Sequence, residues 1–349
     1  MNRRKAFGFL TFLCIATVAM CFIACSKDDN PTGPQAYKGV PLLIVDTDIG
    51  SSTDDLFALE MAYHYASQGK CKLLGVVVDR EGEDCAACTD VMNTYFGYGN
   101  VPIALVRNGI ANPKVFIDYK ALPGYKKPDG TLMFQSSVAD YSSLPDGWQL
   151  YRQLLAAQPD KSVSICSIGF VICLAQLLES GADEYSPLSG VELVRQKVKC
   201  LYLQGTRFKE QKVSYNLFQC INFAETFFRL WPSDVDIIFS PGDVGDRIEY
   251  VPEQVIADID WTDYHPIKQV YMTCNCNTGQ KMWDPLTVIN AVEGNSLFSL
   301  SGRGTVTITS EGITLFIASP TGNSRYQLDG DDLWDAAMLE KLRNVTKIH

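Results

Sequence analysis

Apolar runs recur along the chain, with segments of helical pattern between them. The first run, Val40–Val45, contains no polar residue, which is typical of a strand buried on both faces of a parallel sheet. Five further runs of this kind follow: Leu73–Val78, Val101–Val106, Ser162–Ile168, Val198–Leu203 and Val235–Phe239. This alternation predicts an α/β fold with a mainly parallel sheet flanked by helices.

The C-terminal third shows a different pattern. Gly304–Thr309 and Gly312–Ile317 predict a small hairpin joined by Ser310-Glu311, and 331–344 predicts a closing helix. The segment 112–147, rich in Pro, Gly, Tyr and Ser, is long for a connection. Both a functional lid and a simple surface insertion fit this composition.

Residues 1–24 read as a signal peptide rather than as part of the fold. A basic start is followed by the apolar stretch Phe7–Ile23, and Phe22–Cys25 resembles the lipobox of bacterial lipoproteins. An uncleaved membrane anchor is the alternative. The polar tether 25–36 favours cleavage and lipidation of Cys25, which predicts a lipoprotein of the cell envelope, in the outer membrane of a Gram-negative bacterium. Contact with the membrane is then expected through the lipid anchor only.

The remaining residues, 37–349, are expected to form one domain, because no repeat and no second linker interrupts them. Loss of the three basic residues of the signal takes the net charge from −10 to −13. An acidic domain without basic clusters argues against nucleic acid as a partner. Nine cysteines remain after Cys25, for which buried thiols or one local disulfide are favoured over a zinc site. The oligomeric state stays open, with a homo-oligomer as one option.

Four carboxylates follow the first apolar run within ten residues: Asp46, Asp48, Asp54 and Asp55. Ligands of open α/β sheets bind just beyond the carboxyl ends of such strands. Carboxylates that converge there repel one another unless protons or a cation neutralise them. Because oxygen ligands favour a hard cation, the pattern predicts a site for Ca²⁺ or Mg²⁺.

This acidic segment resembles the N-terminal signature of the inosine/uridine-preferring nucleoside hydrolases. The family spacing is D-x-D-P-G-x-D-D, which Asp46-Thr47-Asp48, Gly50 and Asp54-Asp55 match with two extra residues before the second pair and Ile49 in place of Pro. A D-x-D opening also occurs in haloacid-dehalogenase-type phosphatases. Those carry Thr or Val where this chain has Gly50, and they have no use for the Asp pair.

Three further stretches extend the resemblance over most of the chain. Residues 169–175 are similar to the family's G-P-L-T-N-x-A, with Ile172 at the Thr whose carbonyl binds the metal. Ser214-Tyr215-Asn216 is similar to E-F-N, with Ser214 in place of Glu. Asp284 stands at the metal ligand of the H-D-P segment, and Trp283 replaces a His that many members use as leaving-group acid.

The resemblance implies a calcium site formed by Asp48, Asp55, Asp284 and the carbonyl of Ile172. It also implies that Asp48 is the general base that activates water. Asp54 and Asn216 are then expected to hold the ribose hydroxyls. Trp283 is expected to stack on the aglycone, with packing alone as the alternative, and His265 is a candidate substitute for the lost acid.

The expected activity is calcium-dependent hydrolysis of N-glycosidic bonds in ribonucleosides or related ribosides. Because the metal positions match the family better than the leaving-group positions do, two other functions stay open. One is a catalytically weak or inactive protein of the same fold that binds ribosides or a partner. The other is a structural surface lipoprotein that uses calcium for stability.

Overall fold

β1 (Leu42–Thr47) lies inside a nine-stranded sheet in the computed structural model, which describes residues 37–110 and 113–347. The predicted signal peptide and tether, with Cys25, lie outside these residues. From Ala36 onward the chain forms one compact unit. All six side chains of β1 are buried, because the strand is covered on both faces.

The sheet has the order β10-β9-β11-β6-β5-β4-β1-β2-β3 and is parallel from β3 to β11. It confirms the predicted α/β class. The parallel strands beside β1 are β2 (Lys72–Val78), β3 (Ile103–Leu105), β4 (Val163–Ser167), β5 (Val198–Gln204), β6 (Asp236–Ser240) and β11 (Ser324–Tyr326).

The predicted hairpin is present as β9 (Gly304–Ile308) and β10 (Thr314–Ala318), which pair antiparallel. The hairpin extends the main sheet rather than standing apart from it. The link is β11, which pairs parallel with β6 and touches β9 at Gly304. The chain then ends in α12 (Asp332–Thr346), close to the predicted closing helix.

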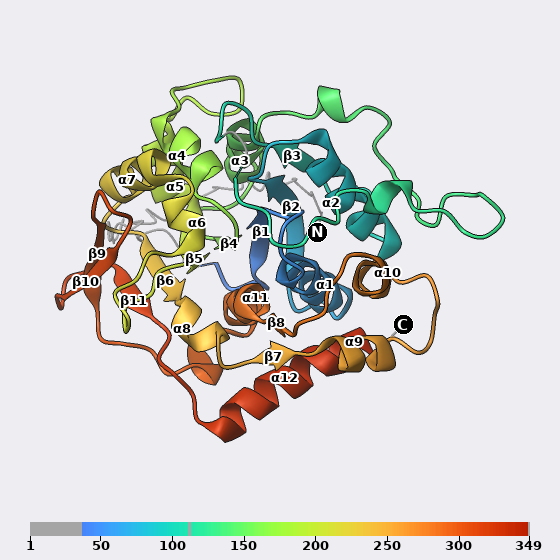
Figure 1. The fold of residues 1–349 in the computed structure, drawn as a ribbon. Coiled ribbons are helices and arrows are strands. Elements are labelled where there is room, and N and C mark those ends of the chain that lie inside the picture. Colours follow the sequence, from blue (N-terminus) through green and yellow to red (C-terminus); the bar gives the residue numbers. More distant parts are fainter. Residues whose placement is uncertain (1–36, 111–112, 348–349) are drawn as a thin grey trace, which may run out of the picture. The chain divides into compact units, whose positions relative to one another are not determined.

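Helices cover both faces of the sheet (Figure 1). One apolar core lies under α1 (Asp54–Ser67), α2 (Glu83–Tyr95), α10 (Pro266–Thr273), α11 (Trp283–Glu293) and α12. The other lies under α3 (Gly147–Ala156), α4 (Ile172–Glu179), α5 (Gly190–Lys197) and α7 (Ile221–Leu230). On the first face α11 packs along α1, which brings two distant parts of the sequence together.

Short elements complete the described part of the chain. They are the helices α6 (Tyr215–Phe218), α8 (Gly242–Gly245) and α9 (Pro252–Asp258), the 3₁₀ turns η1 (Leu122–Gly124), η2 (Tyr141–Ser143) and η3 (Asn295–Leu297), and the ribbon of β7 (Glu249–Tyr250) and β8 (Gln280–Lys281).

The strand order reverses at β1. The chain runs outward from β1 to β2 and β3 on one side, and then returns to β4 on the other side of β1. Such a reversal opens a crevice at the carboxyl ends of the strands, which is where open α/β sheets bind their ligands. The loop after β1, which carries the acidic motif, lies at this crevice.

The long connection between β3 and α3 is largely fixed to the domain. Tyr119, Leu122 and Phe134 are buried in the core, and the carboxylate of Asp90 accepts hydrogen bonds from Ser137, Val138 and Tyr141. These contacts favour a packed surface insertion over a mobile lid.

No helix among residues 37–110 and 113–347 is both long enough and apolar enough to cross a bilayer. All nine cysteines in this part are free thiols, and eight of them are buried.

Candidate active site

The loop after β1 is shaped by a glycine and a buried tyrosine. Gly50 has a φ of 115°, a backbone conformation that residues other than glycine rarely adopt. The hydroxyl of Tyr119 accepts from the Gly50 amide at 2.9 Å and donates to the Ser52 carbonyl at 2.7 Å. Thr47 donates from its hydroxyl to the carboxylate of Asp55. These bonds fix the start of α1 against the end of β1.

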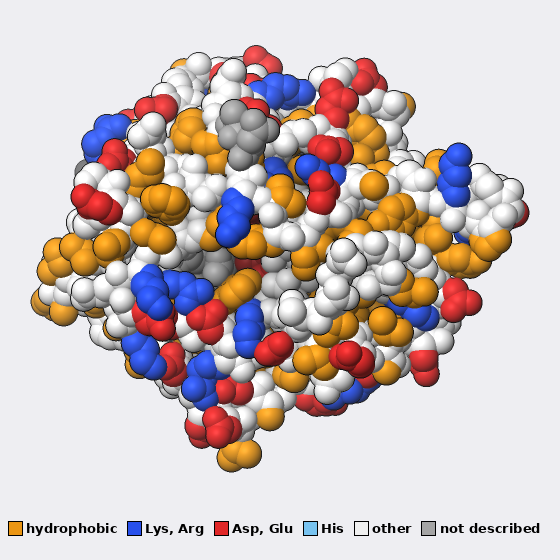
Figure 2. Space-filling model, in the orientation of Figure 1, with side chains coloured by type: hydrophobic (Ala, Val, Ile, Leu, Met, Phe, Trp, Pro, Cys, Tyr) orange, Lys and Arg blue, Asp and Glu red, His pale blue; other side chains and the backbone are white. Residues whose placement is uncertain are grey.

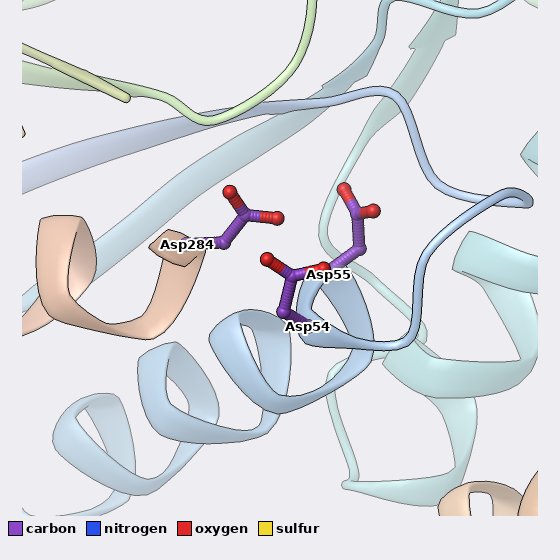
Figure 3. A group of neighbouring side chains, drawn as sticks. All are labelled: Asp54, Asp55 and Asp284. Carbon is purple, nitrogen blue, oxygen red and sulfur yellow. The ribbon is translucent and has the colours of Figure 1, made fainter. Parts of the chain in front are cut away.

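Three carboxylates converge at this point, two from the first turn of α1 and one from the first turn of α11. Oxygen atoms of Asp54, Asp55 and Asp284 all lie within 4.8 Å of one another. Figure 3 shows them turned toward a common space between the two helices. All three side chains are buried. Helix N-termini favour negative charge, but one turn cannot neutralise several carboxylates.

Asp48 lies next to this cluster and is paired with a buried arginine. Its Oδ2 is 2.9 Å from Nη2 of Arg80, and its backbone carbonyl accepts from Nε of Arg80 at 2.8 Å. Among the described residues, no side chain other than that of Arg80 donates to this carboxylate. On its far side Asp48 is packed closely by Gly169, where a Cβ would come within 2.4 Å of the Asp48 nitrogen. Only glycine permits this approach.

The pKa values of all four carboxyl groups are raised, and neighbouring carboxylates contribute to the rise at Asp54, Asp55 and Asp284. Burial is the largest cause at each, and it raises the pKa of Asp54 to about 6. At Asp55 and Asp284, burial raises the pKa first and the neighbouring carboxylates add to it. At Asp48 burial also raises the pKa, while Arg80 opposes the rise. A set of crowded, buried, oxygen-only ligands is the kind of site that a hard divalent cation stabilises, so the residues fit Ca²⁺.

The cluster forms part of the wall of a cleft of about 710 Å³. Figure 2 shows a hollow near the middle of this face, with basic and hydrophobic side chains around it. Asn216, from α6, lines the cleft. Its Nδ2 donates to the Ile168 carbonyl at 2.9 Å and to Oε1 of Gln204 at 2.8 Å, and no described residue donates to its Oδ1.

Trp283 lines the same cleft, held in a fixed orientation. Its indole N–H donates to Oδ1 of Asp246 at 2.8 Å, and Asp246 also forms an ion pair with Arg207. Gly245 allows this arrangement, because a Cβ there would lie 2.3 Å from the indole ring. The N–H of Trp283 is therefore already used.

Ile172, the expected carbonyl ligand, lies at the start of α4, behind the cleft. It is fully buried, and its amide donates to Oδ2 of Asp79 at 2.9 Å. Ile168, four residues earlier, lines the cleft, and Ile172 is not among the lining residues. The structure thus brings Asp48, Asp54, Asp55 and Asp284 together at the cleft, and Ile172 does not line it.

His265 does not lie at the cleft. It is fully buried beside Glu60, with 3.3 Å between Nε2 and Oε1, and its ring packs against Tyr95 and Phe96. It is therefore no substitute for the leaving-group acid. Among the described residues, no histidine lines the cleft.

Arg80 and Asp79 are the main site residues that the sequence reasoning missed. A signal for them exists, because both directly follow the buried apolar run of β2, as Asp46 and Asp48 follow that of β1. Asp246 and Arg207 carry no such signal, since they lie in short elements far from any motif.

Comparisons with known proteins agree with this architecture. No family model matches the chain, and no curated protein matches it in sequence. Among solved structures it resembles the purine-preferring ribonucleoside hydrolase from Gardnerella vaginalis, at a TM-score of 0.63 and 14% identity over 88% of this chain and 99% of that one. The inosine-uridine preferring nucleoside hydrolase from Bacillus anthracis gives 0.63 and 15% over 88% and 100%.

The type III effector protein XopQ, solved in complex with adenosine diphosphate ribose, is similar as well. Its TM-score is 0.62 at 14% identity, over 89% of this chain and 95% of that chain. Identities this low establish the architecture alone. The chain has the nucleoside hydrolase fold.

Proposed function

We propose that this protein hydrolyses N-glycosidic bonds of ribonucleosides or related ribosides in a calcium-dependent reaction. The observation that carries the proposal is the group of four buried carboxylates at the strand-order reversal of a nucleoside hydrolase fold. Structures of the same fold are named as hydrolases of purine and of inosine and uridine nucleosides, and another was solved with adenosine diphosphate ribose. A riboside therefore suits the cleft.

Asp48, Asp55 and Asp284 would hold the ion, whereas Ile172, whose carbonyl the family resemblance implies as the fourth ligand, does not line the cleft. Asp54 is a further candidate ligand, because a carboxylate oxygen of Asp54 lies within 4.8 Å of those of Asp55 and Asp284. A bound Ca²⁺ would lower the pKa of the attacking water.

Asp48 is the base in this proposal. Arg80 holds one oxygen of its carboxylate in place, and no other described side chain donates to the carboxylate, so the second oxygen suits acceptance of a proton from water. The free Oδ1 of Asn216 suits a ribose hydroxyl donor, and Asp54 suits a second one. Trp283, which lines the cleft, is assigned to stack on the aglycone.

A reducing-sugar assay over a panel of nucleosides, with calcium and with EDTA, tests the proposal. Release of ribose should depend on calcium. Asp48→Ala should lower kcat by several orders of magnitude, since loss of a general base alone costs about 10²–10⁴. Asp263→Ala, at an exposed carboxylate far from the acidic motif in sequence, serves as the matched control and should keep full activity.

Silence of the calcium-loaded wild type on every riboside would overturn the enzymatic proposal. Equal rates for wild type and Asp48→Ala would overturn the assignment of the base.

A further inference from the structure

A second cavity, of about 310 Å³, lies outside the cleft described above and shares no lining residue with it. One of its walls is a single face of α1, because four lining residues follow the helical spacing i, i+3, i+4 and i+7. They are Glu60, Tyr63, His64 and Ser67. The other walls come from the end of α2 and the segment after it, from Trp261 before α10, and from Val345 in the last turn of α12. None of these residues has a part in the proposed hydrolysis.

Aromatic side chains dominate the lining of this second cavity. Among the described residues they are Tyr63, Tyr95, Phe96, Tyr98 and Trp261. Tyr63 stacks on Phe96 and on Tyr98, with 5.2 Å between the ring centres in each pair. The indole N–H of Trp261 donates to the carbonyl of Thr346 at 3.2 Å. Because these contacts hold the rings in place, the cavity has a preorganised aromatic wall.

A buried carboxylate adjoins the aromatic wall. Glu60 is 3% exposed, and no lysine, arginine or other acid is among the described lining residues. Its Oε2 accepts from the hydroxyl of Thr346 at 3.2 Å, and its Oε1 lies 3.3 Å from Nε2 of His265. His265 can neutralise Glu60 only when both ring nitrogens carry protons, and its buried Nδ1 has no acceptor among the described residues. The cavity therefore has a negative charge without a fixed cationic partner.

The basic groups nearest to this cavity do not supply that partner. Burial is the main cause that lowers the pKa of His64, and Lys70 and Lys341 add to the fall, so this lining imidazole is uncharged at neutral pH. Lys341 forms an ion pair with Glu293 at 2.8 Å, and Nζ of Lys70 lies 5.4 Å from the centre of the Tyr65 ring. Neither lysine lines the cavity.

We infer that this second cavity binds a quaternary ammonium group of the trimethylammonium type, as in choline. Aromatic rings beside a negative charge are the surroundings that such ions prefer. A quaternary ammonium has no N–H group, so it needs only negative potential and apolar surface, which Glu60 and the rings provide. A primary ammonium would bring three N–H donors to a carboxylate that already accepts from Thr346.

Choline and 3,3-dimethylbutanol provide a matched pair of probes, since they share their shape and only choline is charged. In calorimetry with the purified protein, choline should bind at least about tenfold more tightly than dimethylbutanol, within the range of desolvated cation–π contacts. Its affinity should be the same with calcium and with EDTA, because the cavity and the cleft share no lining residue. Equal affinities for the two probes, or no binding of choline, would overturn the inference and leave the proposed hydrolysis untouched.

Substitutions locate the binding in this cavity. Glu60→Gln keeps the shape and removes the charge, so it should lower choline affinity at least about tenfold and leave that of dimethylbutanol unchanged. Trp261→Leu should also weaken choline binding, and Trp261→Phe should weaken it less. Glu253→Gln, at an exposed acid of α9, is the matched control and should bind choline as wild type does. Thermal melting shows whether each variant is folded, and Tyr98→Leu, at a half-buried ring, replaces one that is not. Undiminished choline affinity in the folded variants would overturn the inference.

Vesicles distinguish a free trimethylammonium compound from a lipid headgroup. A chain that starts at Ala36, where the compact unit begins, carries no lipid of its own and suits this experiment. Sedimentation with phosphatidylcholine vesicles that choline blocks and Glu60→Gln abolishes would identify the headgroup as the source. Choline binding without such sedimentation would identify a free compound, and both results support the assigned chemistry.

Discussion

At Asp55, burial disfavours the negative charge of the carboxylate when no ion is bound. Its carboxylate is buried, and its pKa is raised first by burial and then by Asp48 and Asp54. When a carboxyl group has a higher pKa in the folded than in the unfolded state, its ionisation lowers the free energy of unfolding. The loss begins near pH 4, about the unfolded-state pKa, and grows as the pH rises through the folded-state pKa. At neutral pH its charge therefore destabilises the ion-free fold.

Asp55→Asn is therefore expected to act with opposite signs in the two states. Calorimetry should show that calcium binding is lost, because a charged ligand is gone. In EDTA the variant should melt no lower than wild type, since the amide carries no charge. The difference should grow from pH 5 to pH 8 as the wild-type cluster ionises.

Asp263→Asn, at a highly exposed side chain, should leave both quantities unchanged. Undiminished calcium affinity in Asp55→Asn would refute the ligand assignment, and a lower melting temperature in EDTA would refute the electrostatic argument.

Trp283→His tests whether a leaving-group acid at position 283 would raise activity. Imidazole can donate a proton where indole cannot, so hydrolysis of inosine should rise, by at most the ~10²–10⁴ that an acid contributes. Initial rates on inosine and uridine measure this. Trp283→Phe, which adds no acid, is the control and should give no rise. No gain in the His variant would mean that position 283 lies out of reach of the leaving group.

Among the elements, α3 is anchored by an unusual buried charge. Arg152 is fully buried and forms an ion pair with Asp183, and it also donates to Ser180 and to the carbonyls of Ser186 and Leu188. A single side chain thus holds the segment between α4 and α5 against the sheet-covering helix.

Arg152→Met should lower the free energy of unfolding by about 3–5 kcal/mol, because it leaves Asp183 and two carbonyls without their partner. Arg195→Met, at the exposed pair with Asp234, should cost no more than about 1 kcal/mol. Urea denaturation measures both. Similar losses in the two variants would show that burial does not set the strength of the first pair.

The apolar runs in the sequence predict all the parallel strands except β11, with ends that differ by a few residues. β1, for example, begins at Leu42 rather than Val40 and continues through Asp46 and Thr47. β11 has only three residues, Ser324–Tyr326, and carries no apolar run. It is a strand because β6 pairs with it, and such tertiary pairing leaves no local signal.

The site could be predicted to a similar extent. The convergence of Asp48, Asp54 and Asp55 followed from the strand pattern, whereas Asp284 was assigned from the family resemblance. The partner of the Trp283 N–H could not, because Asp246 meets it only through the packing of α8 against α11.

For the whole molecule, the anchoring of the chain stays a prediction from sequence. We expect the mature protein to begin at a lipidated Cys25, since a lipobox-like segment meets a polar tether. Mass spectrometry of the native protein should find the acylated N-terminal Cys25, and Cys25→Ser should shift the protein from the membrane to the soluble fraction. An intact Met1, or an unmodified Cys25, would contradict the prediction.

Because α1 and α11 together supply the acidic cluster, the ion would link the first helix of the domain to a helix from its last third. During synthesis Asp54 and Asp55 emerge long before Asp284, so the nascent chain carries only part of the acidic cluster and cannot yet form the ion site. A chain cut short before Asp284 would keep the acidic loop and have no partner for it. Uptake of the proposed calcium ion would thus report that the polypeptide extends past Asp284 and that α11 has docked on α1.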